Sequence, residues 1–195
     1  MDERVRLTRL YWQKRRWYER GTHPINRVRL QWELARRGAY ARRPLHGNVL
    51  EALCEGRLQV GEGTLFEPHV WITAPDRARV LIGAGCFLNL GVMVSALSLV
   101  EIGDHVMLAN GCFVSDADHR FEDPDVSTPF QGFATKGPTR IGANTWCGVN
   151  VVVTSGVTVG ERCVIGANSV VTADVPPGCV AAGAPARVLR RLPGA

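Results

Sequence analysis

Aliphatic residues return at every sixth position along most of this chain, with small or polar residues between them. The pattern is most regular in residues 141–176, where only Cys147 takes the place of an aliphatic side chain. A helix with a period of 3.6 residues does not produce this spacing, and neither does a simple alternating strand. The repeat positions come in groups of three: Val60, Phe66, Ile72; Ile82, Leu88, Val94; Ile102, Leu108, Val114; Ile141, Cys147, Val153; Val159, Ile165, Val171.

Six residues are enough for one short strand and one corner. The repeat aliphatic and the small residue four places later then face the same side of the strand. Glycine, asparagine, aspartate or histidine after the aliphatic supplies the corner, because these residues tolerate turn conformations. Three sides close a triangular rung, and each rung buries its apolar side against the next, about 4.8 Å away. The pattern therefore predicts an all-β protein, a parallel β-helix of about five triangular rungs.

Two parts of the chain depart from the repeat. Residues 3–20 and 26–37 lack interior glycine and proline and predict two helices, so residues 1–46 form an α-helical appendage and residues 47–195 the β-helix with its C-terminal tail. The second departure separates Val114 from Ile141 and predicts a long loop inserted at about 117–138. A long polar loop that leaves a packed scaffold is typical of a binding site.

The charge of the chain is divided between these parts. The net charge is +5, but residues 1–43 hold thirteen basic and four acidic side chains, and the remainder is mildly acidic. Basic residues interleaved with aromatic ones are compatible with nucleic acid, yet they equally fit an amphipathic helix, so we expect no nucleic-acid partner. Attraction of the basic N-terminus to an anionic membrane surface is the better minority interpretation. The charged N-terminus resembles no signal peptide, and no run of eighteen apolar residues occurs, so we expect a cytoplasmic protein.

The six cysteines do not form a metal or disulfide motif. No two of them are spaced as CxxC, and Cys86, Cys112 and Cys163 each follow a repeat aliphatic by four positions. That position points inward, so the three are expected to be small buried hydrophobic residues and not ligands or nucleophiles.

His119 is the candidate for acid–base chemistry in the inserted loop. An imidazole can take a proton from a hydroxyl or an amine at cellular pH. Asp116 and Asp118 precede it closely and are candidates to orient its tautomer and to stabilise the imidazolium. From position alone, a loop histidine with an ordinary surface hydrogen bond is an equally good interpretation.

Two stretches carry a resemblance to a known family. The repeat itself and the tail "VIGANSVVTADVPPGCVAAGAPARVLRRL" resemble the hexapeptide-repeat acyltransferases, and the loop "DADHRFEDPDVSTPF" resembles that of the sugar and xenobiotic acetyltransferases among them. The resemblance covers about residues 60–192. It implies a left-handed β-helix, a homotrimer with active sites between subunits, and acetyl-CoA as co-substrate with no permanently bound cofactor. It also makes His119 the general base.

The resemblance extends to individual positions. It implies that Trp146 lines the coenzyme channel, that the backbone N–H of Ala167 stabilises the oxyanion, and that Thr172, Arg187 and Arg190 contact CoA; a guanidinium suits phosphate in geometry and charge. Asn89 matches an asparagine that holds the acceptor, although a structural asparagine at a corner explains it nearly as well. Ala173 and Val149 depart from the residues that many relatives carry, which puts details of the coenzyme contact in doubt.

The expected activity is acetyl transfer from acetyl-CoA to a hydroxyl of a sugar or glycan precursor. N-acetylation of an amino sugar or small xenobiotic is the alternative within enzymes. The same fold hosts carbonic anhydrases that hold zinc with three histidines, but His69 and His105 fall in corner positions, so we expect no metal. A scaffold without activity is the remaining alternative.

Overall fold

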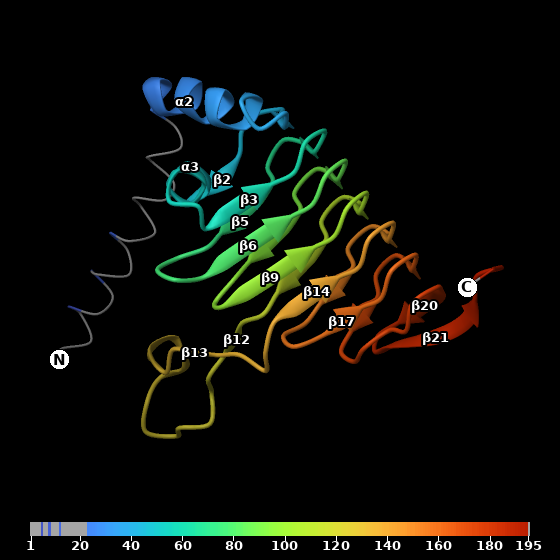
Figure 1. Cartoon of the computed structure of the whole chain (residues 1–195). Coiled ribbons are helices and arrows are strands. Elements are labelled where there is room, and N and C mark those ends of the chain that lie inside the picture. The colour runs from blue at the N-terminus through green and yellow to red at the C-terminus, as the bar shows by residue number, and fades with distance from the viewer. Residues whose placement is uncertain (1–4, 6–7, 9–11, 13–22, 195) are drawn as a thin grey trace.

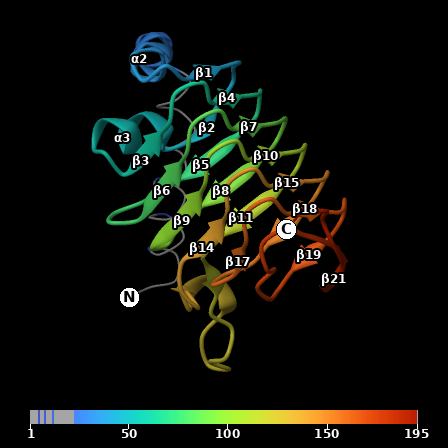
Figure 2. The same ribbon diagram turned by 45° about the vertical axis from the view of Figure 1, so that its right-hand side comes forward.

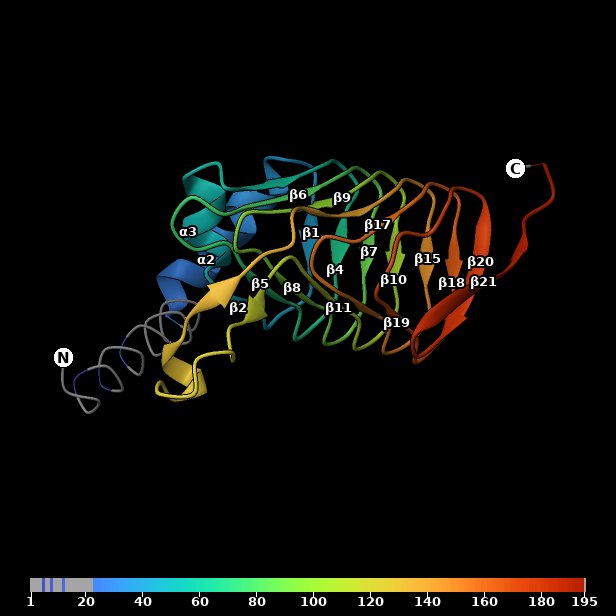
Figure 3. The ribbon, with the colours of Figure 1, turned by 90° about the horizontal axis from the view of Figure 1, so that it is seen from below.

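The chain winds into a left-handed parallel β-helix whose rungs stack along one axis (Figure 1). The computed structural model describes Val5, Thr8, Trp12 and residues 23–194. Three sheets form the sides of the prism, and the rungs contribute strands to them in turn. Figures 2 and 3 show the strands of each side lying next to one another, although they are far apart in sequence.

The sheets have the following strand order. Sheet A holds β1 (Tyr40–Ala41), β4 (Leu65–Phe66), β7 (Phe87–Leu88), β10 (Met107–Leu108), β15 (Trp146–Cys147), β18 (Val164–Ile165), β20 (Cys179–Gly183) and the antiparallel β21 (Ala186–Arg191). Sheet B holds β2 (His46–Gly47), β5 (Trp71–Thr73), β8 (Met93–Ser95), β11 (Phe113–Ser115), β16 (Val152–Val153) and β19 (Val170–Val171). Sheet C holds β3 (Leu58–Val60), β6 (Arg79–Ile82), β9 (Leu99–Ile102), β14 (Thr139–Ile141) and β17 (Thr158–Val159).

The β-helix has about six rungs, one more than the repeat predicts. The additional rung comes first: Tyr40 pairs with Leu65 of sheet A, and His46 pairs with Trp71 of sheet B. The hexapeptide pattern misses this rung because Ala41 and Gly47, which pair with the repeat positions Phe66 and Ile72, are not large aliphatic residues. The helix α3 (Val49–Cys54) then lengthens the path from sheet B to sheet C. The strands of the β-helix therefore begin at Tyr40, ahead of residue 47.

The repeat positions form the core, as expected. All of them are buried apart from the half-buried Val60. The residues four places later are buried as well, except Asp76, Ser98 and Asp118, which follow strands of sheet B. Cys86, Cys112 and Cys163 lie in these inward positions and are free and buried, which confirms the prediction for them. Burial raises the pKa of each of these three thiols, so they stay protonated at neutral pH.

Two positions near each corner have different structural requirements. At most corners the residue three places after the repeat aliphatic has a positive φ, at His69, His105 and Asn144 among others, and this is where the conformational freedom is needed. Glycine directly after the aliphatic has another reason. A Cβ on Gly142 would lie 2.5 Å from the backbone nitrogen of Glu161 in the next rung. The expectation that this first glycine serves the turn conformation is wrong; it allows the rungs to approach.

The helix α2 (Pro24–Ala35) lies across the N-terminal end of the β-helix (Figure 1). It packs Leu30 and Leu34 on the core and agrees with the helix expected at 26–37. The helix expected at 3–20 lies almost entirely outside the described residues. No helix in the described part of the chain is long and apolar enough to cross a membrane.

The predicted loop leaves sheet B after β11 and returns at β14, and it projects from the body of the prism (Figures 1 and 2). It has structure of its own. β12 (Asp118–His119) pairs in antiparallel fashion with β13 (Phe133–Ala134), and the short 3-10 helix η1 (Thr128–Phe130) lies between them. The hairpin gives His119 a defined backbone.

Candidate active site

His119 stands on the edge of this hairpin with its side chain exposed to solvent. It is paired in the ladder with Phe133, and the two rings face each other with their centroids 4.4 Å apart and a tilt of 41°. The aromatic ring covers one side of the imidazole, because aromatic pairs favour such tilted contacts. The other side remains open to a substrate.

Buried hydrogen bonds hold both ends of the loop. The hydroxyl of Ser155 donates to the carbonyl oxygen of Asp116 (2.7 Å) and accepts the N–H of Lys136 (2.9 Å), so one side chain joins the outgoing and the returning strand. The hydroxyl of Thr139 donates to the carbonyl oxygen of Ser115 (3.0 Å). Because these groups are buried, their hydrogen bonds restrain the base of the loop strongly.

Sequence reasoning missed Ser155 and Thr139. A signal was present: the residue after the repeat aliphatic Val153 is Thr154, followed by Ser155, where many other corners carry glycine. Two hydroxyl groups beside a long insertion indicate polar contacts to it.

Asp116 does not have the role expected of it. Its carboxylate is fully buried and accepts the backbone N–H groups of Leu97, Ser98 and Leu99 at 2.6–2.8 Å. Its two oxygens are therefore used to hold a neighbouring turn, and the expectation that they orient the imidazole is wrong. Asp118 forms an ion pair with Lys136 (3.3 Å), across the base of the hairpin.

The structure places two of the predicted coenzyme residues on one row of sheet A. Trp146 pairs with Val164, Val164 pairs with Val180, and Val180 pairs with Arg190 on β21. Three strand spacings separate the tryptophan from the arginine, which is about 14 Å. Arg187 lies on the same final strand, and both arginines are exposed.

Ala167 and Thr172 lie at different corners. Ala167 is exposed where the chain passes from sheet A to sheet B, and among the described residues no group accepts its backbone N–H. Thr172 follows β19, where the chain leaves sheet B for sheet C. A free, exposed N–H is what an oxyanion site requires.

Asn89 has a structural contact at its corner. Its side-chain Nδ2 donates a hydrogen bond of 2.8 Å to the carbonyl oxygen of Leu108 in the next rung. The structural alternative named above is therefore realised, and the amide nitrogen is occupied in the protomer.

The predicted residues fall into two groups on opposite edges of sheet B. His119, Asp118 and Thr172 lie where the chain leaves sheet B for sheet C, whereas Trp146 and Ala167 lie on sheet A or at its corner with sheet B. Ala167 and Thr172 lie at the two ends of one side of a rung. They are five residues apart, which corresponds to about 16 Å of extended strand. A single protomer keeps the two groups apart.

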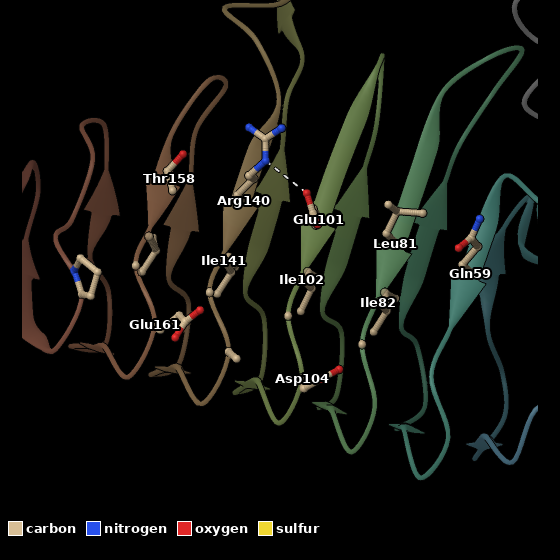
Figure 4. A pocket seen from close by; sticks show the side chains of 17 residues that line it. Gln59, Leu81, Ile82, Glu101, Ile102, Asp104, Arg140, Ile141, Thr158 and Glu161 are labelled. Carbon is tan, nitrogen blue, oxygen red and sulfur yellow. Dashed lines mark hydrogen bonds and ion pairs between the residues drawn. The ribbon is translucent and has the colours of Figure 1, made fainter.

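A shallow groove of about 660 Å³ lies elsewhere, along sheet C and its corner with sheet A (Figure 4). It crosses the rungs beside Gln59, Leu81 and Thr158, and the ion pair between Glu101 and Arg140 (3.1 Å) lies in it. None of the predicted site residues lines it, so we do not assign the chemistry to this groove.

Histidines do not gather as a zinc site would require. His69 lies against His46, with Nδ1 of His69 and Nε2 of His46 3.2 Å apart, and the ring of His46 also stacks on Trp71. In the part of the chain that the structure describes, no three histidine, cysteine, aspartate or glutamate side chains are grouped to hold a metal ion.

Comparison with known proteins agrees with the fold. A model described as "Hexapeptide repeat of succinyl-transferase" matches residues 138–173. A solved structure of galactoside acetyltransferase in complex with coenzyme A is similar over 87% of this chain and 82% of its own, with 32% identity and a TM-score of 0.63. The chain belongs to the hexapeptide-repeat acyltransferases.

Other members of this family are similar over shorter or more distant matches. Galactoside O-acetyltransferase of Escherichia coli K12 is 36% identical over 68% of this chain and 63% of its own length. The structure of a maltose O-acetyltransferase from Clostridium difficile 630 is 28% identical, with a TM-score of 0.58 over 88% of this chain and 77% of its own. The chain spans less than two thirds of the length of the curated hexapeptide-repeat relatives it matches.

Proposed function

We propose that this protein transfers an acetyl group from acetyl-CoA to a hydroxyl of a sugar or glycan precursor, with His119 as the general base. One observation carries the proposal: an exposed imidazole on a hairpin whose base is fixed by buried hydrogen bonds, in a hexapeptide-repeat acyltransferase. The names of the galactoside and maltose O-acetyltransferases support the choice of a sugar hydroxyl.

In the proposed reaction, the imidazole of His119 accepts the proton of the acceptor hydroxyl while its oxygen attacks the thioester carbonyl. The C–O bond forms, and the carbonyl oxygen becomes an oxyanion. The free N–H of Ala167 is positioned at an exposed corner and would donate to it, a contact of a kind that is worth about 3–4 kcal/mol of barrier. The C–S bond then breaks, and the imidazolium returns the proton to the CoA thiolate.

The coenzyme would lie along sheet A. Trp146 supplies an exposed apolar surface for pantetheine, and Arg190 and Arg187 supply charge for the phosphates at the end of the same face. Thr172 would complete the contact from the next corner, and Asn89 would meet the acceptor through its amide oxygen.

We further propose a homotrimer with active sites between subunits. The outward rows of sheets A and B are apolar, with Tyr40, Phe87, Met93 and Met107 each more than 40% exposed, whereas sheet C presents mostly polar residues. Rows of large exposed apolar side chains on neighbouring strands indicate a protein–protein interface. A second copy packed against these faces would bring its Trp146 close to His119 of the first copy. Within one protomer these two residues lie too far apart to act on the same substrate. We place this activity in the cytoplasm, where acetyl-CoA is available.

The proposal is tested by acetyl-CoA consumption with a panel of oligosaccharides, sugar nucleotides and aminoglycosides. Acetyl esters, which alkaline hydroxylamine removes, are the expected product. Amides that resist this treatment would establish N-acetylation instead. If the protein neither consumes acetyl-CoA with any acceptor nor gains thermal stability from CoA, it is a scaffold and the proposal fails.

A further inference from the structure

The helix α2 has a second apolar face, turned away from the β-helix. Ile25, Val28 and Trp32 are 70%, 69% and 61% exposed, while Leu30 and Leu34 of the same helix are buried on the core. The spacing of three and four residues places the exposed side chains on one side of the helix. Large apolar side chains grouped on a surface helix indicate that something covers them.

The charges on this side are all positive. Arg29 and Arg36 lie among the apolar side chains by helical spacing. The guanidinium of Arg36 lies over the ring of Trp32, 5.2 Å from its centroid, and Nη2 of Arg29 donates to Sγ of Cys54 on α3 (3.5 Å). We call these five residues, Ile25, Val28, Arg29, Trp32 and Arg36, the outer face of α2. Within α2 the acidic residue is Glu33, and it is buried and paired with Arg36 and Arg37. The side-chain hydrogen bond from Arg37 lowers the pKa of Glu33, so its carboxylate stays charged at neutral pH and keeps both ion pairs.

We propose that the outer face of α2 docks on an anionic phospholipid surface. An interfacial helix combines aliphatic side chains and tryptophan with arginine, whose long stem is apolar and whose head binds lipid phosphate. The surrounding sequence has the matching charge, since residues 1–43 hold thirteen basic and four acidic side chains. A second copy of the same face would bring arginines against arginines, which is unfavourable, so lipid is the better occupant.

The location suits such contact. α2 lies at the N-terminal end of the β-helix, and the C-terminal tail lies at the other end (Figure 1). Docking through α2 therefore leaves the hairpin of His119 and the outer row of sheet A uncovered. The proposed acetyl transfer and the lipid contact use different surfaces, so each can fail without the other.

The test is sedimentation of the full chain with two kinds of vesicle, one of phosphatidylcholine alone and one in which about 30% of the lipid is phosphatidylglycerol. Each is measured at low and at high salt. We expect binding to the anionic vesicles that weakens with salt. The double substitution Val28→Ser and Trp32→Ser should lower the partition coefficient about tenfold. The matched control, Val188→Ser with Leu189→Ser, removes exposed apolar side chains at the opposite end and should bind like the wild type.

Each other outcome overturns the proposal. Absence of wild-type binding to anionic vesicles does so directly. Equal binding by the Val28→Ser, Trp32→Ser variant means that other residues make the contact. If light scattering shows that this variant loses a higher-order assembly that the wild type and the control both form, a second copy is the occupant.

Discussion

The imidazole of His119 lies against the ring of Phe133, 4.4 Å between centroids, because β12 and β13 pair these two residues across the hairpin. The contact limits the rotation of the imidazole without using either of its nitrogens. A general base needs both properties, a fixed direction and a free nitrogen. The hairpin ladder places the ring of Phe133 against the imidazole.

Replacing His119 by alanine should lower kcat for acetyl transfer by about 10²–10⁴, because a positioned base contributes that much. The KM for acetyl-CoA should change little, since the coenzyme is proposed to bind on sheet A. Steady-state kinetics check both values. The control is His105→Asn, a corner position with positive φ where asparagine is tolerated, and it should keep its activity. Full activity of the His119→Ala variant would contradict the assignment.

Replacing Phe133 by alanine should lower kcat roughly tenfold, since the imidazole then loses the surface that limits its rotation. Phe133→Tyr keeps the ring and should restore most of the rate. Because Phe133 is half-exposed, the midpoint of thermal unfolding should move little in either variant. Equal rates for the alanine and tyrosine variants would show that the ring contact plays no part.

Ser155→Ala should destabilise the fold by about 1–3 kcal/mol, because the N–H of Lys136 and the carbonyl of Asp116 lose a buried partner. The rate of acetyl transfer should fall as well, since the base of the His119 hairpin is released at both ends. Denaturant unfolding and kinetics measure the two effects. Ser98→Ala, at an exposed serine, is the matched control and should be neutral within about 0.5 kcal/mol.

The two kinds of corner glycine should respond differently to substitution. Gly142→Ala places a methyl group 2.5 Å from the backbone of the next rung and should cost about 1–3 kcal/mol. Gly91→Asn has open space around it and needs only a positive φ, which asparagine adopts, so it should cost about 0.5 kcal/mol or less. The reverse order in denaturant unfolding would refute the close-approach explanation.

Stability should fall on mild acidification because of His46. Burial, and then the charge of His69, lower the pKa of His46 in the folded protein. The unfolded state therefore binds more protons below the ordinary histidine value of about 6.5, and stability is complete above that pH and lost as the pH falls below it. Thermal unfolding at pH 7.5 and 5.5 measures the loss. His69→Asn removes one of the two causes of the lowered pKa and keeps the corner conformation, so this variant should lose less stability between pH 7.5 and 5.5 than the wild type. An equal loss of stability would exclude His69 as a cause of the lowered pKa.

The hexapeptide pattern determined the architecture because it is a local signal repeated many times. Each aliphatic repeat position, such as Leu88 or Leu108, indicates one short strand with a buried apolar side. The rungs stack because stacking buries these apolar side chains. The inserted loop was visible for the same reason, as an interruption between Val114 and Ile141. The first rung was not visible, since Ala41 and Gly47 hold its repeat positions and α3 lengthens the chain before the next repeat position.

Only the tertiary structure decided what surrounds His119. Ser155 reaches the loop from the next rung, and Asp116 turns its carboxylate to the N–H groups of residues 97–99, contacts between segments that no local pattern connects. Trp146 and Arg190 likewise share a row only because sheet A ends in the antiparallel β21. The sequence by itself determined the repeating scaffold, because burial has a period, and it named His119 as the candidate base through the resemblance of its loop to a known family. Hydrogen bonds across rungs depend on stacking register, which the fold alone sets.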